Sequence, residues 1–134
     1  MKKKHVILLI VFVVLAGIVI TGVLVKSSLE KNLKQLVNLP IANVDVTKIA
    51  DGKYNGSFSA FPVSAEVIVT IANRKIADID LVRHVTGQGQ AAEILPDKVV
   101  EAQSLDVDSV SGASYSSKVI LKAIEDALAS GDIR

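Results

Sequence analysis

The hydrophobic pattern separates an unbroken apolar stretch near the start of the chain from a longer region of alternating and periodic segments. Residues 6–25 carry no charge and are almost all apolar. As a helix, these 20 residues span about 30 Å, the thickness of the hydrocarbon core of a bilayer. Lysines at positions 2–4 precede the stretch, and the positive-inside rule keeps such an end in the cytoplasm. We therefore predict a transmembrane anchor, with the rest of the chain on the extracytoplasmic side.

A cleaved signal peptide is the competing interpretation of this stretch. The apolar region of a signal peptide is shorter and ends in small residues of the A-x-A type. Here the run ends Val23-Leu24-Val25-Lys26. The sequence thus favours an uncleaved anchor.

The segment after the anchor carries an apolar stripe at helical spacing. The stripe consists of Leu29, Leu33, Leu36 and Val37. Because Pro40 ends this pattern, we expect a short juxtamembrane helix that leads the chain away from the lipid. A connector over 41–49, with room for a strand, should follow. We accordingly divide the chain into a basic tail and anchor (1–25), a juxtamembrane helix and connector (26–43) and a domain (44–134).

Alternating patterns predict a small antiparallel sheet in the domain. A first strand follows the turn pair Asp51-Gly52, a second follows Pro62, and a third follows Asn73-Arg74, so the last two form a hairpin. The inward residues should be Tyr54, Gly56, Phe58 and Ala60 on the first strand, Val63, Ala65, Val67, Val69 and Ile71 on the second, and Ala77, Ile79 and Leu81 on the third.

A glycine-rich loop and helical segments complete the predicted fold. The loop covers 83–90, the helical region 91–103 should be broken by Pro96, and 107–110 has the pattern of a short strand. The last helix should have Ser114 as its N-cap, run from Tyr115 and stop at Gly131. Its apolar positions are Ile120, Ala123, Ile124, Ala127 and Leu128. The fold class is therefore α+β, a small antiparallel sheet with helices packed on one side, preceded by one transmembrane helix.

Charge and composition exclude several classes of function. Three of the 15 basic residues precede the anchor, which leaves 12 basic against 14 acidic residues and a net charge of −2 in the exported part. This balance gives no electrostatic reason to expect nucleic-acid binding. The chain has no Cys and two His, of which His5 lies in the basic tail, so disulfides, Cys nucleophiles and multi-His zinc sites are excluded. Neither the dinucleotide fingerprint nor a P-loop occurs, and no catalytic acid–base pair or metal site is expected.

The candidate chemistry lies where the last helix begins. Residues 108–114 read D-S-V-S-G-A-S and are followed by Tyr115-Ser116-Ser117. Gly112 and Ala113 leave the Ser114 hydroxyl open to a bulky group, and the free N–H groups and dipole of a helix start favour a phosphate. On spacing alone, simple capping by Ser114 is the more ordinary explanation of such a turn.

This stretch resembles the flavin-attachment motif of the FMN-binding domain family, D-x-x-[ST]-[GS]-A-[ST]. That family includes the flavin subunits of sodium-pumping quinone reductases and Rnf-type complexes. The resemblance implies FMN joined by a phosphoester to Ser114, where the family usually has Thr. It also implies a separate flavin transferase that recognises the leading Asp108. A strand beginning D-G-x-Y-x-G at Asp51 and the segment Lys75-Ile76-Ala77-Asp78-Ile79 resemble the family too, so the resemblance covers about 51–131.

The same resemblance implies which residues surround the flavin. The corresponding loop of the family lies close to the flavin, here with His84, Gly87 and Gly89. We expect His84 on the polar face of its strand, where it can hydrogen-bond to a flavin edge; a solvent-exposed histidine at a strand end is the alternative. The motif itself implies further cofactor-binding residues, namely Ser111, Gly112, Ala113 and Tyr115.

These features predict a membrane-anchored extracytoplasmic flavoprotein that carries covalent FMN and passes electrons in a membrane-associated redox chain. Its partners would be a flavin transferase and membrane electron-transfer proteins. Because a cofactor supplies redox chemistry, no catalytic residue is required, and an electron-transfer module is favoured over a self-sufficient enzyme. Two other classes stay open, a flavin-free interaction or structural protein of the cell envelope and a small flavin-dependent reductase.

Overall fold

The computed structural model describes residues 2–132 and contains two units, the first 32 residues and the region from Leu33 onward. Helix α1 (Lys2–Val37) is the long apolar helix that the sequence predicts, and it is long and apolar enough to cross a membrane. The expected juxtamembrane helix is not separate, because its residues form the last turns of α1. Of the predicted stripe, Leu36 is buried and Leu33 is partly buried against the core of the second unit.

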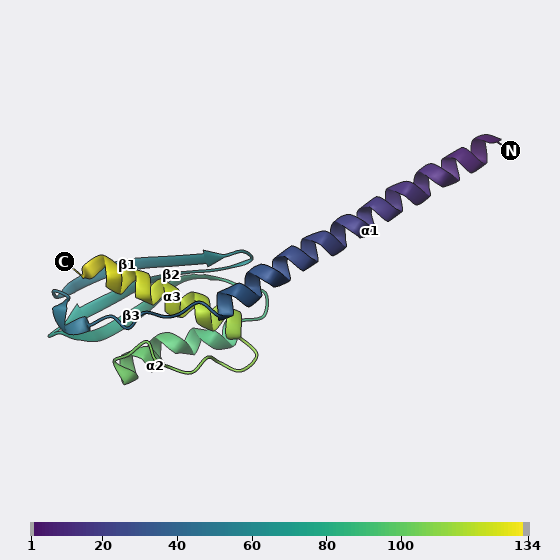
Figure 1. The fold of residues 1–134 in the computed structure, drawn as a ribbon. Coiled ribbons are helices and arrows are strands. Elements are labelled where there is room, and N and C mark those ends of the chain that lie inside the picture. Colours follow the sequence, from purple (N-terminus) through teal and green to yellow (C-terminus); the bar gives the residue numbers. More distant parts are fainter. Residues whose placement is uncertain (1, 133–134) are drawn as a thin grey trace. The chain divides into compact units, whose positions relative to one another are not determined.

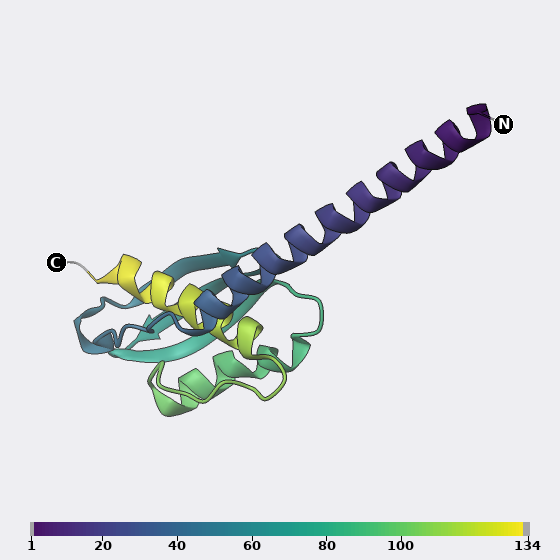
Figure 2. The same ribbon diagram turned by 45° about the vertical axis from the view of Figure 1, so that its right-hand side comes forward.

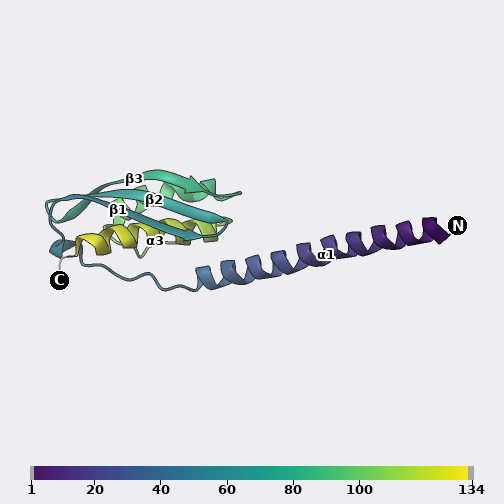
Figure 3. The same ribbon diagram turned by 90° about the horizontal axis from the view of Figure 1, so that it is seen from above.

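The second unit is built on a three-stranded antiparallel sheet in the order β1-β2-β3. The strands are β1 (Gly52–Ala60), β2 (Val63–Ala72) and β3 (Lys75–Val85). The hairpin turn between β2 and β3 has positive φ at Asn73 (53°) and Arg74 (60°), as a two-residue hairpin with the favoured twist requires. Helices cover one face of the sheet (Figure 3), so the predicted α+β class is confirmed.

The alternating pattern predicted the inward-facing residues of β1 and β2 correctly, but two bulges change which residues of β3 face inward. Ala77 and Val82 are extra residues that have no partner on β2. Each extra residue reverses the face to which the following side chains point. Ala77, predicted to face inward, is therefore exposed, and His84, predicted on the polar face, lies opposite Ala65 and faces the helices.

The sheet is followed along the chain by the 3₁₀ helix η2 (Gln90–Ile94), α2 (Leu95–Ala102) and α3 (Ser114–Gly131). The predicted break at Pro96 is confirmed, since η2 gives way to α2 with Pro in its first turn. Helix α3 lies along β1 and β2, and α2 lies beside β3 (Figure 1). The chain then runs back along α2, so that α3 begins close to η2 (Figure 2). All five predicted apolar positions of α3 are buried.

The prediction of a short strand over 107–110 is wrong. The backbone N–H of Val107 donates to the Leu105 carbonyl, and that of Val110 donates to the Ser117 hydroxyl at 3.0 Å. These groups are satisfied by nearby loop and helix residues and do not pair with a neighbouring strand.

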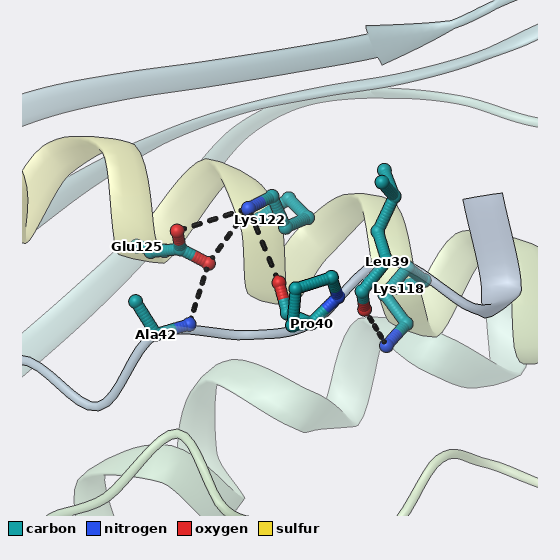
Figure 4. A network of polar contacts seen from close by, with 6 residues as sticks. All are labelled: Leu39, Pro40, Ala42, Lys118, Lys122 and Glu125. Carbon is teal, nitrogen blue, oxygen red and sulfur yellow. Dashed lines mark hydrogen bonds and ion pairs between the residues drawn. The ribbon is translucent and has the colours of Figure 1, made fainter.

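The segment after α1 is attached along the outer side of α3 (Figure 4). The Lys118 ammonium donates to the Leu39 carbonyl at 2.8 Å, and the Lys122 ammonium donates to the Pro40 carbonyl at 3.5 Å. Lys122 also pairs with Glu125 at 2.9 Å, and Glu125 accepts from the Ala42 N–H at 3.2 Å. We expected the domain to begin at residue 44, whereas the compact unit begins at Leu33 and includes this segment.

The connector contains a short 3₁₀ helix, η1 (Val46–Lys48), in place of a strand. Asp45 caps η1, because its carboxylate accepts from the hydroxyl of Thr47 at 2.6 Å and from the backbone N–H of Thr47 at 3.1 Å. These hydrogen bonds stabilise the charged carboxylate and lower the pKa of Asp45 below its usual value.

Candidate functional site

At the start of α3, the Ser114 hydroxyl neither caps the helix nor closes the turn before it. The prediction that Ser114 is the N-cap is wrong, because Ala113 occupies that position and no side chain caps the helix. The turn is closed instead by the Ala113 N–H bonded to the Val110 carbonyl at 3.0 Å and by the Ser117 hydroxyl, which accepts from the Val110 N–H. Ser114 is the first helical residue, its side chain is exposed, and its hydroxyl makes no hydrogen bond among the described residues.

The neighbouring serines differ from Ser114 in access. Ser116 and Ser117 are buried, with 2% and 0% of their surface exposed, and both hydroxyls are already hydrogen-bonded. Ser111 is exposed but lines neither of the two hollows at the start of α3. Among these four hydroxyls, only that of Ser114 is both accessible and next to a hollow.

Two adjoining hollows meet at Ser114. The first has a volume of about 310 Å³ and lies between the turn before β2, the loop 86–89 and the first turn of α3. The second has a volume of about 560 Å³ and is bordered by Lys34, Val37 and Asn38 from the end of α1. Gly112, Ser114 and Tyr115 line both, and Lys34 is the one charged residue among all the lining residues.

The structure brings most of the residues implied by the motif and the loop to these hollows. The predicted residues that line them are Gly87, Gly89, Gly112, Ala113, Ser114 and Tyr115. Asp108 and Ser111 lie outside, both exposed, on the segment that leads to α3. His84 is also absent from the lining, because its side chain is only 3% exposed and lies behind the loop.

A chain of hydrogen bonds links His84 to the loop and to α3. The Nδ1 atom of His84 lies 2.9 Å from Glu93 Oε1, and its Nε2 atom lies 3.0 Å from Ser116 Oγ. Ser116 Oγ lies 2.9 Å from Thr86 Oγ1, which also accepts from the Gly89 N–H at 2.9 Å. The imidazole therefore joins β3, η2 and α3 and holds the loop in place.

Sequence reasoning missed three members of this chain, Thr86, Glu93 and Ser116. Thr86 and Ser116 also line the smaller hollow. The one sequence signal for a His84–Glu93 contact is a histidine at a strand end followed by a glutamate in the next helical turn. That signal does not reveal the bulge at Val82, which turns His84 inward.

The surroundings of Ser114 favour an anionic group. The first N–H groups of a helix have no helical partner and attract an anion, and Lys34 adds a positive charge at the second hollow. A Cβ atom built on Gly87 or Gly112 would meet nothing within 4 Å, so space for a flat group is present at both positions. No acidic side chain lines either hollow to repel a phosphate.

Ser114 thus has an exposed hydroxyl beside a hollow, in the first turn of α3, where free helix N–H groups attract anions. Comparison with known proteins gives the family. The FMN-binding domain family matches residues 63–129, which is half of the chain, and the chain belongs to this family. The predicted membership is confirmed.

One relative is a named enzyme. The NADH:acrylate oxidoreductase of Vibrio harveyi is 30% identical over 102 residues, which cover 74% of this chain. The matched region is 10% of the length of that enzyme. The chain therefore corresponds to a small part of this relative.

Proposed function

We propose that this FMN-binding protein carries its FMN as a phosphoester on Ser114, is anchored in a membrane with its domain outside the cytoplasm, and passes electrons in a membrane-associated redox chain. The observation that carries the proposal is the exposed Ser114 hydroxyl, free of hydrogen bonds to the described residues, at the meeting point of two hollows. The stretch from Asp108 to Ser114 resembles the flavin-attachment motif of the family and lies inside the region that the family matches. The other serines nearby are either buried or away from the hollows.

Attachment would use FAD as the flavin donor and a separate transferase as catalyst. The Ser114 oxygen forms a bond to the phosphorus nearest the flavin as the pyrophosphate bond breaks; AMP leaves, and the hydroxyl proton is lost. Asp108 is exposed before the helix, where an external enzyme can reach it. The N–H groups at the start of α3 and the ammonium group of Lys34 would offset the charge of the resulting phosphodiester.

Bound FMN supplies the redox chemistry, and the protein supplies position and surroundings. The chain spans a tenth of the reductase that it resembles, so most of that enzyme has no counterpart in it. The two hollows adjoin Ser114, and their volumes are in the range of small-molecule sites, as a bound flavin requires. An electron carrier therefore fits this chain better than a self-sufficient reductase.

Substitution of Ser114 tests the attachment. The full chain, produced together with a flavin transferase, should show flavin fluorescence after denaturing electrophoresis and a mass increased by one FMN group. Ser114→Ala should abolish both signals, and Ser114→Thr should keep them. Ser109→Ala, at an exposed position that the motif leaves open, is the matched control that should also keep them.

The stability of the Ser114→Ala protein should stay within about 0.5 kcal/mol of the parent, because Ser114 makes no capping hydrogen bond. Thermal unfolding therefore shows whether loss of flavin has a chemical or a structural cause. Covalent flavin on a folded Ser114→Ala protein would refute the assignment, and a parent that never acquires flavin with a competent transferase would refute the function.

Protease protection tests the proposed location. Protease added to intact protoplasts should remove the domain and leave a fragment that contains residues 6–25, because the lysines at positions 2–4 keep that end inside. A cytoplasmic protein serves as the protected control. Digestion of the domain only after lysis would reverse the orientation.

A further inference from the structure

We propose that the buried chain from Glu93 through His84 and Ser116 to Thr86 stores one proton behind the hollow and exchanges it with a group bound there. The proposal rests on the proposed function, in which FMN occupies this hollow. It assigns to His84 the role of a positioning and proton-holding residue, without direct contact with the cofactor.

The chain of contacts is continuous, and its two middle members, His84 and Ser116, are buried. Its three links measure 2.9 Å from Glu93 to His84, 3.0 Å from His84 to Ser116 and 2.9 Å from Ser116 to Thr86. The side chain of His84 is 3% exposed and Ser116 is 2% exposed, whereas the side chain of Glu93 is 47% exposed. The Thr86 and Ser116 end lines the hollow, so the chain connects a solvent-facing carboxylate to the candidate flavin site.

Two hydrogen-bond arrangements satisfy every atom of the chain. In both, His84 donates from Nδ1 to the Glu93 carboxylate, and the Gly89 N–H donates to Thr86 Oγ1. With a proton on Nε2, His84 donates to Ser116, Ser116 donates to Thr86, and the Thr86 hydroxyl hydrogen is free to point into the hollow. Without that proton, Thr86 donates to Ser116, and Ser116 donates to Nε2.

These two arrangements differ by one proton delivered to the hollow. As the Thr86 proton passes to an acceptor there, the Ser116 proton passes to Thr86 and the Nε2 proton passes to Ser116, which gives the second arrangement. No atom has to move away from its partner, and the reverse sequence returns the proton to His84. Glu93 keeps its hydrogen bond with Nδ1 in both arrangements.

In the described part of the chain, Glu93 is the one titratable residue that hydrogen-bonds to the His84 ring. Around His84, η2 contributes Glu93, α3 contributes the Ser116 hydroxyl, and β2 contributes Ala65 opposite it in the sheet. The neighbouring pair Arg83–Glu66 has both side chains more than half exposed, at 65% and 51%. Of the groups that hydrogen-bond to the ring, Glu93 alone can change its charge.

Flavins take up protons when they are reduced by two electrons. In the proposed redox chain these electrons come from a reduced donor protein and leave to an oxidised acceptor protein, so only the proton concerns the domain itself. A store beneath the site would provide a proton on reduction and recover it on reoxidation.

Nitrogen-15 spectra of the His84 ring test this store in the full chain in detergent micelles, with His5 as the internal reference. The chain loaded with FMN is compared before and after reduction by dithionite, and gel fluorescence first establishes that flavin is present. We expect Nε2 of His84 to lose its proton on reduction and to regain it on reoxidation, while His5 does not change. Equal Nε2 signals in the two redox states would overturn the proposal.

Variants of Thr86 separate proton transfer from structural support. Thr86→Val keeps the shape and removes the hydroxyl, and should abolish the redox-linked change at Nε2. Thr86→Ser keeps the hydroxyl and should retain the change. In the chain prepared without transferase, Glu93→Gln should alter the Nδ1 signal, which tests the hydrogen-bonded chain without flavin.

The possible failures are distinguishable. Absence of FMN from the parent refutes the proposed function and this proposal together. Bound FMN with an unchanged His84 signal, or a Thr86→Val protein that responds like the parent, refutes the proton store alone. An unaltered Nδ1 signal in Glu93→Gln shows that the hydrogen-bonded chain itself is not formed.

Discussion

The glycines around the C-terminal half of helix α3 and those around its start have opposite surroundings. Along its C-terminal half, a Cβ atom on Gly56 would overlap the backbone of Ala123 and Ala127, and one on Gly131 would overlap Ile49 and Tyr54. At its first turn, a Cβ on Gly112 or on Gly87 in the neighbouring loop would meet nothing within 4 Å. One half therefore uses the missing side chain for close packing, and at the other the glycines border open space.

Gly56→Ala should have the largest effect, because it acts on the closely packed half. The added methyl group meets helix backbone, which moves less readily than a side chain, so the helix must shift away from β1. We expect a loss of about 3 kcal/mol in the free energy of unfolding, at the upper end of overpacking effects. Thermal unfolding of the full chain in detergent, followed by circular dichroism, measures it. A stability equal to that of the parent would show that the two halves do not differ as described.

The sequence predicts the closely packed half well, for a physical reason. One face of β1 and β2 is buried, and a shift by one residue would expose all of its apolar side chains, so alternation is strictly required there. The bulges at Ala77 and Val82 could not be predicted in this way. A bulge depends on how β3 bends to meet its neighbours, and no residue type at those positions demands one.

The sequence indicated where the open half of α3 lies, but not which residues form the cap and close the turn there. The motif indicated Ser114 and its hollow, because Gly112 and Ala113 identify a turn that leaves room. The assignment of Ser114 as N-cap was wrong because the helix begins one residue earlier than expected, with the Ala113 carbonyl accepting the first helical hydrogen bond from the Ser117 N–H at 2.8 Å. The Ser117 hydroxyl, about one turn inside the helix, satisfies the Val110 N–H of the turn. A side chain that acts across a turn cannot be found from local capping preferences alone.

Gly112→Ala should have an intermediate effect, and through a different mechanism. Gly112 has a φ of +77°, a conformation that costs a residue with a Cβ atom about 1 kcal/mol. We therefore expect a loss of about 1 kcal/mol in stability with no steric clash. Gly112→Asn is the matched control, because Asn tolerates this conformation better and should lose less. Equal stability of the Ala variant and the parent would contradict the account.

Gly87→Ala should have the smallest effect on stability, and its main effect should be on the spectrum of the bound flavin. Gly87 lines the smaller hollow, a methyl group there meets nothing within 4 Å, and its φ lies outside the left-handed region. We expect stability within about 0.5 kcal/mol of the parent, and FMN attached to the same extent, since Ser114 is unchanged. The flavin absorption spectrum should nevertheless shift, because the methyl group occupies space that the ring would use.

Gly89→Ala, two residues along the same loop, is the matched contrast to Gly87→Ala. A Cβ on Gly89 would overlap the hydroxyls of Ser116 and Thr86, so this variant should lose stability and disturb the His84 chain. Circular dichroism and absorption spectra of the two variants, recorded side by side, separate space kept for the ligand from space filled by the protein. A Gly87→Ala protein with an unaltered flavin spectrum would place the ring away from this loop. An unstable one would show that the loop has no free space at Gly87.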